Sequence, residues 1–172
     1  MASAPKQTAA LADSEFSIRR FKPGDESALR EIFFNTIHQV NSRDYSSLQI
    51  QAWAPQDYDK SQWYQRMCAI QPFVALWDEQ IVGYADIQPD GYIDHFFCHW
   101  QYQGRGIGKS LMNTLMAQGS EMGVERFYAH VSISAKPFFT RCGFEQVKAQ
   151  QVSIRGQVLS NFVMQKIQQA KV

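Results

Sequence analysis

The fold is decided by the stretch Gln103-Gly104-Arg105-Gly106-Ile107-Gly108-Lys109-Ser110, which joins a predicted strand to a predicted helix. The first backbone N–H groups of a helix have no partners inside the helix, and the helix dipole makes that end positive. Three glycines let a ligand approach the backbone without meeting a Cβ atom. Arg105 and Lys109 add positive charge. The stretch therefore predicts a binding site for an anionic group such as a phosphate.

Three phosphate-binding patterns compete for this stretch. A Walker loop needs glycine where Gln103 stands, and a dinucleotide fingerprint that starts at Gly104 needs glycine where Lys109 stands. The pattern Gln/Arg-x-x-Gly-x-Gly/Ala, in contrast, is met by Gln103, Gly106 and Gly108. The third pattern is the one that the sequence satisfies.

The rest of the chain predicts a mixed α/β arrangement around this stretch. Alternating apolar residues predict strands, and apolar residues three and four apart predict helices. The expected strands cover residues 16–21, 73–77, 81–87, 92–98, 126–132, 144–154 and 158–165. The first two expected helices follow Asp25 and Ser46 or Ser47 as caps, and the third covers residues 59–69. A fourth begins in the glycine-rich stretch and ends at Gly119 and Gly123, and a fifth covers residues 135–141. This order describes one domain with one sheet.

A second unit downstream carries a family resemblance. Ser132, Ala135, Phe139, Gly143 and Phe144 match the downstream pattern Asn-x-x-Ala-x-x-x-Tyr/Phe-x-x-x-Gly-Phe, with serine in the first place. Together with the glycine-rich stretch, this unit resembles the GNAT superfamily of N-acetyltransferases, whose acetyl-CoA signature is the third pattern. The chain looks most similar to the small bacterial YafP-type branch, through the stretches YIDHFF (92–97), QIQAWAP (49–55) and RGQVLSNFVM (155–164).

The resemblance implies both the fold and the cosubstrate. The fold is an α/β (mixed α+β) sandwich with a central mixed, largely antiparallel sheet that is splayed at its middle and has helices on both faces. Residues 15–168 form the single domain, and residues 1–14 are expected to be a disordered tail. Acetyl-CoA is the expected cosubstrate. The expected cofactor-binding residues are Phe96, Phe97, Cys98, Gln103, Gly104, Arg105, Gly106, Ile107, Gly108, Lys109, Ser110, Phe138 and Phe139.

A polar pair inside an apolar strand is the candidate for proton transfer. An amine like that of lysine is protonated at pH 7, so a base must take its proton before it attacks a thioester. Asp94 and His95 stand in the strand that leads into the glycine-rich stretch. His95, with a reference pKa near ~6.5, suits a base, and a water molecule could serve instead. Successive strand residues face opposite sides, so both face the substrate only if a bulge intervenes.

The leaving group raises a separate question. Many family members have a tyrosine at the position of Phe139, where its hydroxyl can protonate the thiolate, and phenylalanine has no such group. The acid is then Ser132, Tyr128 or water, or the thiolate leaves without being protonated. Ser132 is the third catalytic candidate.

Two other chemistries are disfavoured. His95 and His99 lie on one face of a strand but roughly 13 Å apart at ~3.3 Å per residue, too far to share a zinc ion bound at about 2–2.3 Å. We therefore expect no metal. Cys98 could be a nucleophile in a two-step route, but it has no clear activating partner. Direct attack in a ternary complex is the route that the resemblance implies.

The acceptor region is expected around the first helix. The resemblance places an acceptor pocket there, with His38, Tyr45 and Trp53 as candidates. Asp86, on the predicted strand 81–87, is a further pocket candidate. Aromatic residues would close a small pocket, which favours a primary amine on a small molecule. The alternatives are a protein lysine or N-terminus as acceptor, or a CoA-binding sensor without turnover.

Composition narrows the class of partner and compartment. The net charge of +1 over 172 residues gives no indication of nucleic acid or an anionic membrane as partner. Three scattered cysteines indicate no disulfide framework, and no apolar run approaches the ~20 residues of a membrane span. We expect a cytoplasmic monomer or homodimer.

Overall fold

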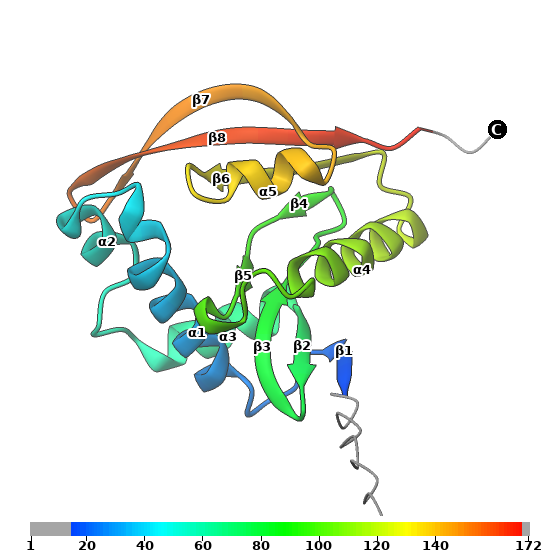
Figure 1. The fold of residues 1–172 in the computed structure, drawn as a ribbon, viewed down its shortest axis with the longest axis horizontal. Coiled ribbons are helices and arrows are strands. Elements are labelled where there is room, and N and C mark those ends of the chain that lie inside the picture. Colours follow the sequence, from blue (N-terminus) through cyan, green and yellow to red (C-terminus); the bar gives the residue numbers. More distant parts are fainter. Residues whose placement is uncertain (1–14, 170–172) are drawn as a thin grey trace, which may run out of the picture.

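The computed structural model describes residues 15–169, and the expected N-terminal tail, residues 1–14, lies outside them. Two four-stranded sheets lie side by side in the order β1-β2-β3-β5 and β4-β6-β8-β7 (Figure 1). Only β4 and β6 run parallel among the pairs of described strands. The predicted mixed, largely antiparallel, splayed sheet is therefore confirmed. The strands are β1 Phe16–Arg20, β2 Phe73–Trp77, β3 Gln80–Ala85, β4 Tyr92–Ile93, β5 Phe96–Cys98, β6 Arg126–Ser132, β7 Glu145–Ile154 and β8 Gln157–Ile167.

The splay falls inside the segment that we predicted as one continuous strand, residues 92–98. That prediction is wrong, because β4 pairs with β6 of one sheet and β5 pairs with β3 of the other. Asp94 and His95 make the crossover between them. Their backbone N–H groups are bound by the buried carboxylate of Asp86, at 3.2 Å and 2.6 Å. The side chain of Asp86 thus replaces a strand partner where the sheets part.

Helices cover both faces of the sheets, as predicted (Figure 1). On one face, α1, α2 and α3 share a core with Val74 and Tyr84, and on the other face α4 and α5 share a core with Ala75 and Ala85. Cross-strand neighbours such as Val74 and Tyr84 point to the same side, which separates the two cores. Within residues 15–169, no helix is sufficiently long and apolar to span a membrane. The helices are α1 Glu26–Gln39, α2 Ser47–Trp53, α3 Lys60–Ile70, α4 Ile107–Glu121 and α5 Lys136–Arg141, with short 3-10 turns at Asn41–Arg43 and Trp100–Tyr102.

The predicted helix starts are correct in position. Ser46 forms a capping box with Gln49, and Asp59 accepts from the backbone N–H of Gln62. Asp25 stands at the N-cap of α1, but its carboxylate accepts from Arg19 and from the backbone of Lys22 instead of the helix. It therefore ties β1 to the turn before α1.

Two glycines predicted to end α4 have different roles. Gly123, with a φ of +76°, follows the last turn as a left-handed terminator. Gly119 lies inside the helix, so the prediction for it is wrong. A Cβ atom there would lie 2.2 Å from Cε1 of Phe127. The glycine lets the ring of β6 lie directly against α4.

Candidate functional site

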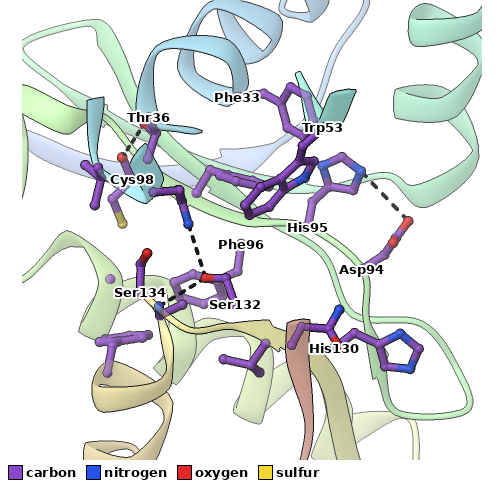
Figure 2. Close-up of a pocket in the computed structure, with 18 of the residues that line it drawn as sticks. Phe33, Thr36, Trp53, Asp94, His95, Phe96, Cys98, His130, Ser132 and Ser134 are labelled. Atoms are coloured by element: carbon purple, nitrogen blue, oxygen red, sulfur yellow. Dashed lines mark hydrogen bonds and ion pairs between the residues drawn. The ribbon is translucent and has the colours of Figure 1, made fainter. Parts of the chain in front are cut away.

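A cavity of about 840 Å³ opens where the two sheets part. Its lining comes from α1, the β4–β5 crossover, the glycine-rich loop, β6, α5 and the β7–β8 hairpin. Figure 2 shows Ser132 and His130 on β6 across from the segment that carries Asp94 to Cys98. The cavity therefore joins the predicted phosphate loop to the predicted catalytic pair.

The backbone of the glycine-rich loop is free to bind an anion. Among residues 15–169, no hydrogen bond uses the backbone N–H of residues 103–109. Gly104 and Gly106 have φ angles of +74° and +83°, and a Cβ atom at either would have no neighbour within 4 Å. Gly106 is the N-cap of α4, so free amides, open space and the positive end of a 15-residue helix coincide.

The loop prediction needs two corrections. The backbone N–H of Ser110 donates to the carbonyl of Gly106, so it belongs to the helix and is not available to a ligand. Arg105 is not among the lining residues, because its guanidinium packs over the ring of Tyr102, 4.8 Å from the centroid. Lys109 does line the cavity.

The two phenylalanines of α5 differ in position. Phe138 lines the cavity, and a Cβ atom at Gly108 would lie 3.1 Å from its ring. Glycine at 108 therefore lets the helix start lie against this ring. Phe139, which we predicted as a cofactor-binding residue, is 4% exposed and packs on Phe96 and Phe144, so it belongs to the core and does not line the cavity.

One edge of β5 is open toward the cavity. Residues 95, 97 and 99 bond with the β3 segment, so the backbone groups of Phe96 and Cys98 point to the other edge. The Cys98 carbonyl accepts from Thr36 Oγ1 at 2.9 Å and Gln103 Nε2 at 3.1 Å. The N–H groups of Phe96 and Cys98 have no partner among residues 15–169. An extended chain could bond there as an added strand.

His95 is buried among aromatic rings. The rings of Phe33, Trp63, Tyr84 and Phe97 all lie with centroids within 5.8 Å of its imidazole. This burial lowers the pKa of His95 well below its ordinary value, although the charge of Asp94 opposes the shift. The expectation of a group that titrates near neutral pH is therefore wrong, and His95 is neutral at pH 7.

The neutral ring has a defined proton position. Tyr84 Oη lies 3.0 Å from His95 Nδ1, and burial raises the pKa of Tyr84 well above its ordinary value. Tyr84 Oη has no other hydrogen-bond partner among residues 15–169, so its buried proton is assigned to the bond with Nδ1 and the imidazole proton to Nε2. Nε2 lies 3.9 Å from Oδ2 of Asp94 (Figure 2). The same oxygen accepts a hydrogen bond from Arg66.

Ser132 lies across the cavity from β5 (Figure 2). Its oxygen accepts from Asn41 Nδ2 at 3.2 Å and from the backbone N–H of Ala135 at 3.1 Å. With two donors on the oxygen, the hydroxyl hydrogen is left for a third group. Tyr128, the other hydroxyl that we considered, does not line the cavity and donates to Asp90 at 2.7 Å.

The acceptor predictions divide in two. Tyr45 and Trp53 line the cavity. His38 does not, because its Nε2 bonds to the carbonyl of Ala54 and its ring stacks on Phe34. Asp86 is fully buried and does not line it either, because its oxygens bind the crossover backbone.

Several lining residues were missed. Arg30 and Arg155 reach the cavity, as do Thr36, Asn41 and His130. A signal for Arg30 exists in the sequence, because it shares the helical spacing of Phe33 and Ile37 on the apolar face of α1. Arg155 is in a hairpin turn, where a charged residue is ordinary and gives no signal.

Cys98, the cysteine that lines the cavity, is not a nucleophile. Burial raises the pKa of Cys98 to about 12, so the thiolate is absent at neutral pH. Between residues 15 and 169, no group of three or more His, Cys, Asp or Glu side chains is placed to hold a metal ion.

Comparison with known proteins gives consistent matches. A family model described as "Acetyltransferase (GNAT) domain" matches residues 41–166. The uncharacterized N-acetyltransferase YafP of Escherichia coli (strain K12) is 37% identical over 151 residues, which cover 88% of this chain and 95% of YafP.

Solved structures share the fold. A GCN5-related N-acetyltransferase from Rhodopseudomonas palustris has a TM-score of 0.85 and 29% identity, over 88% of this chain and 95% of that one. The PaiA N-acetyltransferase of Thermoplasma acidophilum, solved in complex with coenzyme A, has a TM-score of 0.70 and 18% identity, over 90% and 99% of the two chains. At that identity the second likeness shows the fold alone.

Proposed function

The chain belongs to the GNAT family and is an acetyl-CoA-dependent N-acetyltransferase, and from this premise we propose that its acceptor is a primary amine on a small molecule, acetylated by direct attack in a ternary complex. The observation that carries the proposal is the coincidence of free loop amides, an open edge of β5 and Asp94 in one cavity. Together they offer places for a diphosphate, an extended thioester arm and an amine.

The backbone holds the cosubstrate. The N–H groups of residues 103–109 bind the pyrophosphate, and the N–H groups of Phe96 and Cys98 bind the arm as an added strand would. One of these amides also polarises the thioester carbonyl. Much of the rate enhancement comes from holding the two reactants together.

Asp94 takes the role of proton acceptor. His95 carries its proton on Nε2 and offers no free nitrogen lone pair to the amine, whereas Asp94 lines the same cavity with a carboxylate. This carboxylate attracts the ammonium form and takes its proton directly or through water. His95 holds its place beside Asp94 by the bond from Tyr84.

Ser132 faces the leaving group. The neutral amine attacks the carbonyl, the C–N bond forms, and the C–S bond breaks to release the thiolate. The free hydroxyl hydrogen of Ser132 is placed to bond to that thiolate, because both lone-pair directions of its oxygen are occupied. The high pKa of Cys98 supports direct attack over transfer through an acetylated cysteine.

A thiol-release assay tests the proposal. Acetyl-CoA is offered with a panel of small primary amines, with lysine-containing and free N-terminal peptides as the protein-acceptor arm. We expect release with small amines, and Asp94→Asn to lower kcat/KM about a hundredfold. The matched control is Asp90→Asn, an exposed carboxylate outside the cavity.

Two results would change the conclusion. Turnover confined to peptides would move the acceptor class to proteins. Tight acetyl-CoA binding without release to any amine would favour a CoA sensor, a reading that the missing hydroxyl at Phe139 supports.

A further inference from the structure

Two guanidinium groups of the cavity lining come from elements other than the phosphate loop and the helix that follows it. Arg30 on α1 and Arg155 in the β7–β8 turn both line it. Each donates one hydrogen bond to the chain at the end of α2, Arg30 to the carbonyl of Pro55 at 2.6 Å and Arg155 to that of Ala52 at 2.8 Å. The two cations are thus attached to one short stretch and act on each other electrostatically.

Arg30 is unusually buried for a charged side chain. It is 8% exposed, and its guanidinium carbon lies 4.2 Å from the ring centroid of Tyr58 and 5.2 Å from that of Trp63. This burial, together with the charge of Arg155, lowers the pKa of Arg30. Burying a cation in such a place is costly unless an anion or many acceptors compensate it.

Within the described residues, no carboxylate is paired with either arginine. The ion pairs among residues 15–169 join Arg19 to Asp25 and Asp94 to Arg66 and His95, and none includes Arg30 or Arg155. Asp94 is the sole carboxylate among the cavity's lining residues. A guanidinium has five N–H donors, so each of the two arginines keeps most of its donors for another partner.

We propose that the acceptor amine carries a carboxylate, phosphonate or phosphate group, which binds between Arg30 and Arg155. Bidentate recognition of such groups is what guanidinium geometry favours. The inference rests on the proposed function, since it names the substrate class of that same site.

The aromatic side chains beside Arg30 indicate what the rest of the acceptor molecule is like. Arg30 and His95 contact the same two rings, those of Phe33 and Trp63, so the anion site and Asp94 lie beside one small aromatic surface. The acceptor is therefore a compact molecule with an amine at one end, an apolar or aromatic body, and the anionic group at the other.

Other positively charged side chains are available to bind the phosphates of the cosubstrate. Lys109 and Arg141 line the loop end of the cavity, and both act electrostatically on Cys142 beside α5. Arg30 shares the rings of Phe33 and Trp63 with His95, and Arg155 acts electrostatically on Arg30. The two pairs of cations serve two different anionic groups.

Arg155 is the residue to change, because it is exposed in a turn and Arg30 is buried in the core. Arg155→Asn removes the charge and tolerates the φ of +43° at this position. Arg155→Lys keeps the charge. The matched control is Lys148→Gln, which removes one positive charge from an exposed position on the same hairpin, outside the cavity.

Two readouts separate this inference from the proposed function. Calorimetry follows benzoate, phenylphosphonate and inorganic phosphate titrated into protein saturated with acetyl-CoA, which needs no turnover. Thiol release compares 4-(aminomethyl)benzoate and 3-aminopropylphosphonate with neutral analogues in which an amide or ester replaces the anion.

We expect at least one anion to bind, and Arg155→Asn to weaken that binding about tenfold, the loss of one charge-assisted contact. Arg155→Lys should stay within about threefold, and Lys148→Gln should have no effect. The anionic amines should have lower KM values than their neutral analogues, and the acetyl-CoA affinity should be the same in all variants.

The inference is overturned if none of the three anions binds, if Arg155→Asn leaves their binding unchanged, or if it weakens acetyl-CoA to the same extent. Binding that depends on Arg155 without release to any amine would keep the anion site and refute the proposed acetyl transfer. Equal turnover of anionic and neutral amines without anion binding would refute the anion site and keep the proposed acetyl transfer.

Discussion

Replacing Asp86 with asparagine tests how the chain is held at the point where the two sheets part. The buried carboxylate accepts from the backbone N–H groups of Asp94 and His95 and from the side chain of Gln88. Burial raises its pKa from 3.8 to about 6, against the effect of the hydrogen bond from His95. The difference corresponds to about 3 kcal/mol of interaction that disfavours the ionised form in the folded protein.

The sign follows from proton linkage. The folded state holds this proton more tightly than the unfolded state, so the contribution of Asp86 to stability is present below pH 3.8 and is lost as the pH rises through 6. Asparagine does not titrate. The stability of wild type relative to Asp86→Asn should therefore fall by about 2 kcal/mol between pH 4.5 and 7.5. This fall is most of the ~3 kcal/mol that corresponds to the whole pKa difference.

Urea unfolding of both proteins across this pH range measures the difference. Asp90→Asn is the control of opposite sign, because the bond from Tyr128 lowers the pKa of the exposed Asp90. A difference for Asp86→Asn that stays flat, or that moves in the same direction as for Asp90→Asn, would refute the account of the crossover.

Three shorter tests address the site and the core. Wild-type protein incubated with acetyl-CoA alone should carry no acetyl group on Cys98 by peptide mass spectrometry, and its presence would refute direct attack. Ser132→Ala should lower kcat about tenfold in thiol release and leave the calorimetric acetyl-CoA affinity within about threefold; an unchanged kcat would remove Ser132 from the mechanism. Gly119→Ala should lower the free energy of unfolding by about 2 kcal/mol, because its Cβ would overlap the ring of Phe127, and an unchanged urea midpoint would show that the ring can move.

The sequence predicted those features that depend on residues close together in the chain. The helix start at Ser46 follows from a side chain that binds an amide three residues away, so this cap is readable from spacing alone. The loop between Gln103 and Lys109 was readable for the same reason, because a helix start and its glycines are adjacent in the chain.

The crossover was not readable, because strand partners come from distant parts of the chain. Residues 92–98 carry one continuous apolar pattern, yet their two halves pair with different sheets. The prediction of Asp86 as a pocket residue failed because a polar residue in an apolar strand can have either of two roles. It is a site residue if it faces a cavity, and a structural acceptor if it faces unpaired backbone.

The charge state of His95 was also beyond the sequence. Its pKa depends on four aromatic rings, which come from α1, α3, β3 and β5. Arg30 was missed for a related reason. Its spacing puts it on the apolar face of α1, but the sequence does not show that its guanidinium lines a cavity.

A pair of glycine substitutions tests the central claim that the amides of the loop bind the cosubstrate's diphosphate. Gly106 and Gly123 flank α4 with φ angles of +83° and +76°, and a Cβ atom at either would meet nothing within 4 Å. Alanine therefore strains both positions alike, but it enters the anion site at Gly106 alone. Calorimetric titration with acetyl-CoA should give a Kd at least about tenfold higher for Gly106→Ala, and an unchanged Kd for Gly123→Ala. Equal affinity in the two variants and in wild type would contradict the account.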